Sequence, residues 1–275
     1  MKKIILYILF LFILMFGSYK CYRYFNPKYI PLPPRAEITL TIIPGWDLRD
    51  VAEYLVSKKL ATSTADVYEI TGEPARKYKV SDEAFVFGPS DDLLESRPFG
   101  LSMEGYLAPE TLRVFADADL SEIVDKFYFA RKDQLTPAIL TTVKTSKKSL
   151  HEILTLASIL EREVRGLEDK KIVADIFWRR LAINWALQAD STVHYAVAKE
   201  GNVFTTTKDR QVDSPWNTYK YPGLPPGPIC NPGLESIQAT LEPTKNNYWY
   251  FLTGKDGKVY YAKTLEEHNA NKKHL

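Results

Sequence analysis

The sequence predicts an α+β protein with three structured parts: an N-terminal transmembrane helix, a small α/β subdomain, and a larger mixed α+β domain with a C-terminal β-hairpin. Three observations predict this architecture. An uncharged apolar run occupies residues 4–19, a strand pattern with two capped helices follows at 38–70, and helical patterns followed by two strand patterns fill the second half. The expected boundaries are an anchor at 1–25, a spacer at 26–36, the subdomain at 37–72, a linker at 73–102 and the main domain at 103–275.

Composition narrows the function classes. The chain has 275 residues, of which 45% are hydrophobic and 25% charged, as in ordinary globular proteins. Its 36 basic and 34 acidic side chains leave a net charge of +2, so no overall field attracts nucleic acid. The two cysteines, Cys21 and Cys230, lie far apart. We therefore expect no disulfide framework and no metal cluster. No cofactor is expected either.

The N-terminal apolar run is expected to be an uncleaved signal anchor. It is a little shorter than the roughly 20 residues of a spanning helix, but lysine and tyrosine at its edges can reach the membrane surface. No small-residue cleavage site follows it, so a cleaved signal peptide is the alternative. The positive-inside rule does not favour export of the domains that follow the helix, because the side after it carries more cations than the side before it: Lys20, Arg23 and Lys28 against Lys2 and Lys3.

The small subdomain follows a stiff proline-rich spacer. Residues 38–42 alternate isoleucine or leucine with threonine and predict a strand. Asp47 can cap a helix over 48–56, and Ser63 with Asp66 caps a second helix to about residue 70. Strand, helix and helix in this order resemble part of a LysM-like module, a fold that many cell-wall proteins use to hold amino sugars. The alternative is a packing subdomain without a ligand.

The main domain is expected to contain several helices before a final hairpin. The helical patterns cover 120–130, 150–164, 168–185 and 233–241, and the strand patterns cover 248–252 and 258–262. Thr264 with Glu267 caps one more helix at the C-terminus.

The helix at 150–164 carries the main catalytic candidate. Ser149 and Glu152 form a capping box at its start, and the helix is apolar nearly all round, so it belongs inside a domain. Glu161 lies where a leucine is expected, within about 60° of Leu154 on the helix surface. A carboxyl group removed from water tends to hold its proton, as a general acid must. The alternative is a buried Glu satisfied by a backbone amide or by Arg180.

Glu163 projects to the side of this helix opposite Glu161, so we expect it to face solvent or form an ion pair. Further polar candidates follow the helix, and a stiff loop at 223–233 is suited to a cleft wall, since residues 223–228 alone hold three prolines and two glycines. For each polar candidate the alternative is a structural hydrogen bond. We expect the following residues to bind substrate: Gln188, Asp190, Thr192, Tyr195, Asn217, Thr218, Tyr219 and Glu104.

An ordered set of motifs resembles one known family. The segments are L-A-S-I-L-E (156–161), Q-A-D-S-T-V-H-Y-A (188–196), W-N-T-Y (216–219), G-L-P-P-G-P-I-C-N-P-G (223–233) and L-E-E-H-N (265–269). They are similar to the MltG or YceG-like endolytic murein transglycosylases, and E-G-Y-L-A-P-E-T (104–111) resembles the segment that precedes the family's catalytic part. The likeness covers about residues 38–269.

The resemblance implies a lyase that cleaves the β-1,4 bond between N-acetylmuramic acid and N-acetylglucosamine in new peptidoglycan and leaves 1,6-anhydro ends. It implies a single-pass membrane protein whose catalytic domain, 103–275, lies outside the cytoplasm. Its expected partners are glycan strands, the cytoplasmic membrane and cell-wall synthesis proteins, and no nucleic acid. The family's catalytic glutamate maps onto Glu161, and Gln188, Asp190 and residues 217–219 match positions of its cleft.

Some residues depart from the family pattern, and two other functions stay open. Ser191 stands where the family usually has proline, and Arg179 where it usually has asparagine. A hydrolytic muramidase would need a second carboxylate, for which Asp190 or Glu104 could serve. A noncatalytic peptidoglycan-binding scaffold would use Glu161 only as a buried hydrogen-bonding residue. Serine-hydrolase and zinc chemistry are not expected, because no G-x-S-x-G or H-E-x-x-H spacing occurs.

Overall fold

The computed structural model describes residues 2–26, 35–77, 93, 96–198 and 205–275. These residues divide into two compact units, Met1–Ala36 and Glu37–Leu275. The first unit is built on α1 (Lys2–Phe25), a helix with exposed apolar side chains and a mean hydropathy of 2.1 over its candidate span. The predicted apolar helix is thus confirmed, and it is long and apolar enough to cross a membrane.

The second unit begins with a two-stranded antiparallel sheet. Strand β1 (Glu37–Thr41) pairs with β2 (Thr111–Phe115), so that Glu37 faces Phe115 and Thr41 faces Thr111. Between them lie α2 (Leu48–Ser57) and α3 (Thr64–Thr71), whose predicted N-terminal caps, Asp47 and Ser63, are both present. The pairing of β1 with β2 crosses the predicted boundary at 102/103, and most of the predicted linker lies outside the described residues.

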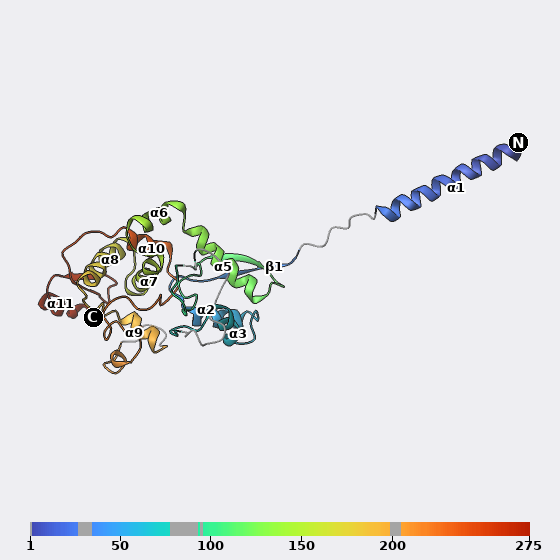
Figure 1. Cartoon of the computed structure of the whole chain (residues 1–275). Coiled ribbons are helices and arrows are strands. Elements are labelled where there is room, and N and C mark those ends of the chain that lie inside the picture. The colour runs from blue at the N-terminus through green and yellow to red at the C-terminus, as the bar shows by residue number, and fades with distance from the viewer. Residues whose placement is uncertain (1, 27–34, 78–92, 94–95, 199–204) are drawn as a thin grey trace. The chain divides into compact units, whose positions relative to one another are not determined.

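Helix α7 (Leu150–Glu163) is the central element of this unit, and its predicted capping box is present. Every residue from 150 to 160 except Glu152 is buried. One side of α7 packs into a core shared with β1, α2 and α5 (Leu120–Gln134), and the other into a core shared with α8 (Leu167–Ala182). In Figure 1, α8 and α10 (Leu234–Leu241) lie beside α7, and both helices contact it.

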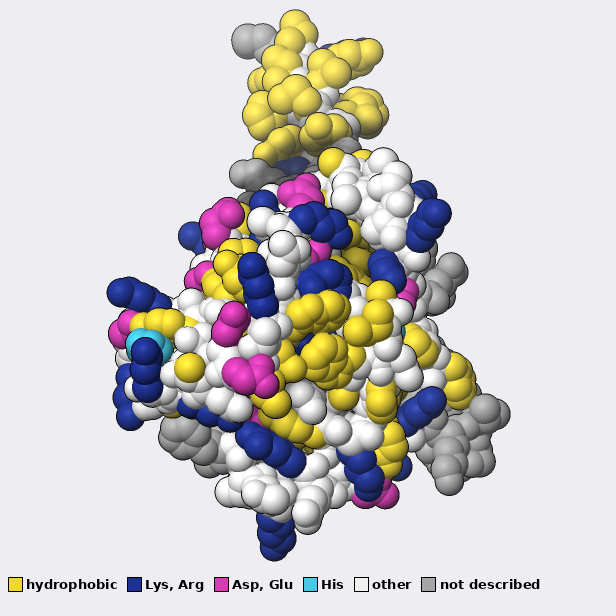
Figure 2. Space-filling model, turned by 90° about the vertical axis from the view of Figure 1, so that its left-hand side faces the viewer, with side chains coloured by type: hydrophobic (Ala, Val, Ile, Leu, Met, Phe, Trp, Pro, Cys, Tyr) yellow, Lys and Arg dark blue, Asp and Glu magenta, His cyan; other side chains and the backbone are white. Residues whose placement is uncertain are grey.

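The remaining elements surround this pair of cores. Helix α6 (Pro137–Thr145) precedes α7, and α9 (Asp190–Ala196) follows α8. Strands β3 (Tyr250–Thr253) and β4 (Val259–Ala262) pair antiparallel and contact α11 (Leu265–Asn271). Short 3₁₀ turns lie at Asp209–Gln211 (η1) and Lys272–His274 (η2). On the face shown in Figure 2, basic and acidic side chains are interspersed over the folded unit, with hydrophobic patches between them.

Candidate active site

The two glutamates at the end of α7 lie in different surroundings. Glu161 is held by three donors: Lys170 Nζ lies 3.2 Å from Oε1, and the backbone N of Gly233 and Oγ of Ser236 donate to Oε2 over 2.9 and 2.7 Å. The Glu161 and Lys170 side chains are only 12% and 7% exposed. Glu161 therefore joins α7 to α8 and to the start of α10. The expected backbone-amide partner is present, but Lys170 occupies the place that was expected of Arg180.

Glu163 instead lines a cavity of about 500 Å³. Glu163 is half-buried, so the expectation of a solvent-facing or ion-paired residue is met only in part: its hydrogen bonds come from Ser191, whose backbone N and Oγ both donate to Oε1, over 3.1 and 2.6 Å. Burial raises the pKa of Glu163, and the two bonds from Ser191 lower it only in part. The other polar residues that line the cavity are Arg180, Gln188, Asp190, Arg210, Tyr219, Tyr250, His268 and Lys272.

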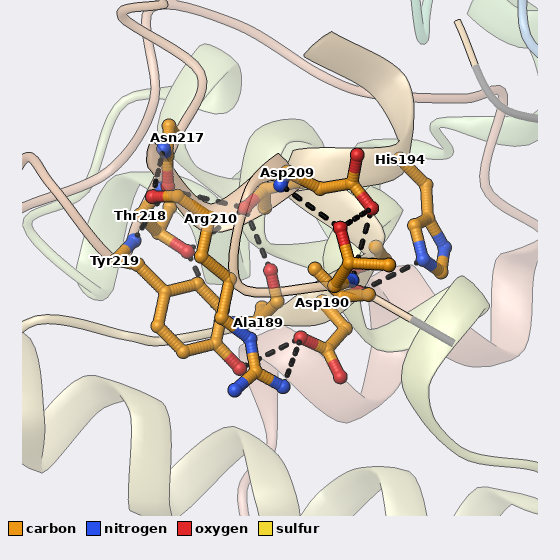
Figure 3. A network of polar contacts seen from close by, with 12 residues as sticks. Ala189, Asp190, His194, Asp209, Arg210, Asn217, Thr218 and Tyr219 are labelled. Carbon is orange, nitrogen blue, oxygen red and sulfur yellow. Dashed lines mark hydrogen bonds and ion pairs between the residues drawn. The ribbon is translucent and has the colours of Figure 1, made fainter. Parts of the chain in front are cut away.

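Three of the predicted substrate-binding residues meet in this cavity: Gln188, Asp190 and Tyr219. The hydroxyl of Tyr219 donates to Asp190 Oδ1 over 2.7 Å, and Arg210 lies 3.4 Å from the same oxygen (Figure 3). The Arg210 guanidinium also lies over the Tyr219 ring, 4.8 Å from its centre. Asp190 is thus a charged acceptor in the same cavity as Glu163.

Three other predicted residues are buried in the scaffold behind this wall. Thr192 and Thr218 share a hydroxyl contact of 2.9 Å, and Thr218 Oγ1 accepts from the backbone N of Ala189. Asn217 donates through Nδ2 to the carbonyls of Arg210 and Val212, and it accepts from the backbone N of Tyr219 (Figure 3). All three side chains are at most 1% exposed. They hold the cavity wall and do not line the cavity.

Glu104 and Tyr195 form a separate buried pair. The Tyr195 hydroxyl donates to Glu104 Oε2 over 3.1 Å, and the backbone N of Leu48 donates to the same oxygen. Glu104 is 2% exposed, and burial raises its pKa well above the ordinary value, with Asp47 adding to the effect. In this arrangement the pair ties α2 to α9 and has no surface to offer to a ligand.

Several residues around the two carboxyl groups were not expected from the sequence. The sequence could have indicated that Lys170 is buried, because it lies on one face of α8 with Val173, Ala174 and Phe177, all three fully buried. A lysine in such a row needs a buried partner. Ser236, Arg210, His268 and Lys272 had no comparable signal, since their roles depend on tertiary contacts. Within the described ranges, no group of three or more His, Cys, Asp or Glu side chains is arranged to hold a metal ion.

The cavity has the parts of an acid–base site. Glu163 has the raised pKa of a carboxyl group that can carry a proton, while Asp190 is paired with a cation. Carboxyl groups in such different surroundings can take different roles in one site. Amide, phenol and imidazole groups around them can bind a polar substrate.

Comparison with known proteins gives the relationship of the chain. A model of the YceG-like family matches residues 26–274. An endolytic murein transglycosylase of Bacillus subtilis (strain 168) is 41% identical over 171 residues, which are 62% of this chain and 47% of that protein. One of Streptococcus pneumoniae serotype 2 (strain D39) is 33% identical over 246 residues, which are 85% of this chain and 44% of that protein. The chain therefore spans a little under half the length of these curated relatives.

A solved structure agrees with the sequence matches. The 2.6 Å crystal structure of a yceG-like protein from Listeria monocytogenes is 36% identical, with a TM-score of 0.70 over 86% of this chain and 75% of that one. The family model covers almost the whole of the second unit and its sequence motifs occur in order. This chain belongs to the YceG-like family.

Proposed function

We propose that this protein is an endolytic murein transglycosylase, a lyase that cleaves glycan strands of peptidoglycan internally. The observation that carries the proposal is the cavity that brings Glu163, a carboxyl group with a raised pKa, together with Gln188, Asp190 and Tyr219. The names of the relatives support the same activity, since the Bacillus and Streptococcus proteins are both endolytic murein transglycosylases.

The reaction needs only one carboxyl group. The protonated acid donates its proton to the glycosidic oxygen between N-acetylmuramic acid and N-acetylglucosamine, and the C1–O bond breaks as an oxocarbenium-like centre develops. The resulting carboxylate takes the proton of the muramic acid C6 hydroxyl, whose oxygen attacks C1 of the same sugar. A 1,6-anhydro ring forms, and no water is consumed. Intramolecular attack has a high effective molarity, so a second catalytic carboxylate is not required.

The geometry favours Glu163 over Glu161 as this acid. Both oxygens of Glu161 are occupied by donors, one of them the Lys170 ammonium, and this environment suits a carboxylate. Glu163 accepts its hydrogen bonds on Oε1 only, and within the part of the chain that the structure describes no donor reaches Oε2. The assignment to Glu161 stays a prediction from the family resemblance, and the two assignments have opposite experimental outcomes.

Mass spectrometry of purified glycan strands, incubated with wild type, Glu163→Gln and Glu161→Gln, tests the proposal. Wild type is expected to release fragments with 1,6-anhydro ends. Glu163→Gln is expected to release none while keeping a normal melting curve, and Glu161→Gln to retain cleavage if it folds. Loss of cleavage in a folded Glu161→Gln protein, with cleavage retained in Glu163→Gln, would return the acid to Glu161. Absence of cleavage by wild type would remove the enzyme proposal and favour a binding scaffold.

A hydrolytic muramidase is the second candidate, because Asp190 shares the cavity with Glu163 and could act as the second carboxylate. The hydrogen bond from Tyr219 and the ion pair with Arg210 favour a structural role for Asp190 instead. The products separate the two reactions, because a hydrolysed end is heavier than an anhydro end by one water. Reducing ends as the only product would establish hydrolysis.

We further propose that the subdomain at residues 37–72 is a LysM-like module that binds glycan, with β2 completing its sheet, and that α1 anchors the protein with its catalytic domain outside the cytoplasm. The strand–helix–helix–strand order of β1, α2, α3 and β2 supports the first idea. Peptidoglycan lies outside the cytoplasmic membrane, which supports the second. Protease digestion of intact spheroplasts tests the orientation, since residues 37–275 should be cleaved from outside. Cell-wall synthesis proteins remain the expected partners.

A further inference from the structure

Ser191 makes the only two hydrogen bonds that the described residues give to Glu163. Its backbone N and its Oγ converge on one carboxyl oxygen, Oε1, over 3.1 and 2.6 Å. Ser191 is itself 4% exposed, so these donors are shielded from competing water. It lies next to Asp190, which lines the same cavity, in the first turn of α9. The bonds therefore connect the end of α7 to the segment that carries the cavity wall.

We propose that Ser191 is a positioning residue that fixes the Glu163 carboxyl with Oε1 as acceptor, leaving Oε2 to carry the proton that is transferred. The inference rests on the proposed function. Two donors on Oε1 occupy the lone pairs that a proton on that oxygen would need, so the proton of the neutral acid resides on Oε2. No described donor holds Oε2, and Glu163 lines the cavity that would receive the substrate.

The same two bonds adjust the acid strength of Glu163. Hydrogen bonds to a carboxylate favour the charged form, so they offset part of the rise in pKa that burial causes. Removing the hydroxyl of Ser191 should therefore raise the pKa further and make the acid weaker. Other charged or titratable groups lie around Glu163. They are Arg162 on α7, Arg180 on α8, Asp190 on α9, Tyr250 on β3, and Arg210, Tyr219, His268 and Lys272, which line the same cavity.

Two measurements on the full chain test this role. The first follows the Glu163 side-chain carboxyl by ¹³C NMR as pH is varied, with the signal assigned by its loss in Glu163→Gln. The second measures kcat and KM against pH on purified glycan strands. In Ser191→Ala the NMR titration should move to higher pH, and kcat should fall about tenfold with little change in KM, the effect of losing one hydrogen bond to a charged group. Ser191→Thr, which keeps both donors, should restore both values.

Ser236→Ala is the matched control, because Ser236 donates to Glu161 over 2.7 Å and makes no bond to Glu163. It should leave the Glu163 titration where it is in wild type. An unchanged titration in Ser191→Ala overturns the inference, and so does an equal shift in Ser236→Ala. If Ser191→Ala does not fold, Ser191→Cys, a weaker donor of similar size, must give the same upward shift. If wild type does not cleave glycan, the proposed function fails, while the NMR titration still decides whether Ser191 controls Glu163.

Discussion

Glu161 and Glu163 are separated by two positions on α7, and a rotation of about 100° per residue points them to opposite sides of the helix. One side meets α8 and α10, where Lys170 supplies a counter-charge. The other side faces α9, where Ser191 donates to Glu163 and the cavity begins. A buried carboxyl group with a cation beside it is suited to hold structure together. Glu163 is half-buried and, within the described residues, accepts its hydrogen bonds from Ser191 and not from a cation, so it is suited to exchange a proton.

The pH dependence of activity should follow Glu163. A general acid works only while it is protonated. The value of kcat/KM should therefore be high at low pH and fall as pH rises through the pKa of Glu163 in the folded enzyme. Because burial raises that pKa, the loss should occur at higher pH than for an exposed glutamate, whose pKa is about 4.3. Measurement of kcat/KM against pH checks this. A limb that coincides with that of an exposed glutamate would argue against Glu163 as the acid.

Glu104 should affect stability and not catalysis. Its folded pKa is raised, so its contribution to stability is present below the unfolded value, about 4.3, and is lost as pH rises through the folded value. Glu104→Gln cannot ionise, and it should become the more stable protein at alkaline pH, with a gain of about 1.4 kcal/mol for each pH unit between the two pKa values. The difference in melting temperature between Glu104→Gln and wild type, followed from pH 4 to 9, measures this gain in stability. A difference that does not change with pH would show that Glu104 is ionised in the folded protein.

The limits of sequence reasoning are clearest at single residues. The periodicity of 150–164 correctly separated the sides of Glu161 and Glu163, but both sides are inside the domain, and only tertiary packing decides which one opens onto a cavity. The W-N-T-Y motif marked the right segment. It did not show that Asn217 and Thr218 are buried supports while Tyr219 lines the cavity.

At the scale of elements, local chemistry predicted the helices well. The caps at Asp47, Ser63, Ser149 and Thr264 are all present, because a capping side chain needs only the next three residues. Strand β2, helix α6 and helix α9 were not predicted. Strand β2 exists through its pairing with β1, and α9 has only seven residues. Helix α6 had a readable start, since Thr136 caps it and Pro137 occupies its first turn.

The junction of α7, α8 and α10 should depend on the ion pair between Lys170 and Glu161. Lys170→Met leaves the Glu161 carboxylate buried without its cation, and we expect the free energy of unfolding to fall by about 3 kcal/mol. Lys171→Met is the matched control, because Lys171 lies 3.9 Å from the exposed Glu242, and such a surface pair is worth about 0–1 kcal/mol. Urea unfolding of both variants measures the difference. Equal losses of unfolding free energy in the two variants would show that the buried ion pair stabilises the fold no more than the surface pair does.

At the scale of the whole molecule, the chain consists of an apolar helix and one folded unit that begins at Glu37. Because β1 pairs with β2 and both cores lie within 37–275, we expect a protein without residues 1–36 to fold by itself. Its melting temperature should match that of the full chain, and it should cleave purified glycan strands at the same rate. Only the full chain should sediment with membranes, since α1 carries the exposed apolar surface. A shortened protein that still sediments with membranes would point to a second membrane contact on the folded unit, and one that unfolds would show that α1 or the spacer completes its core.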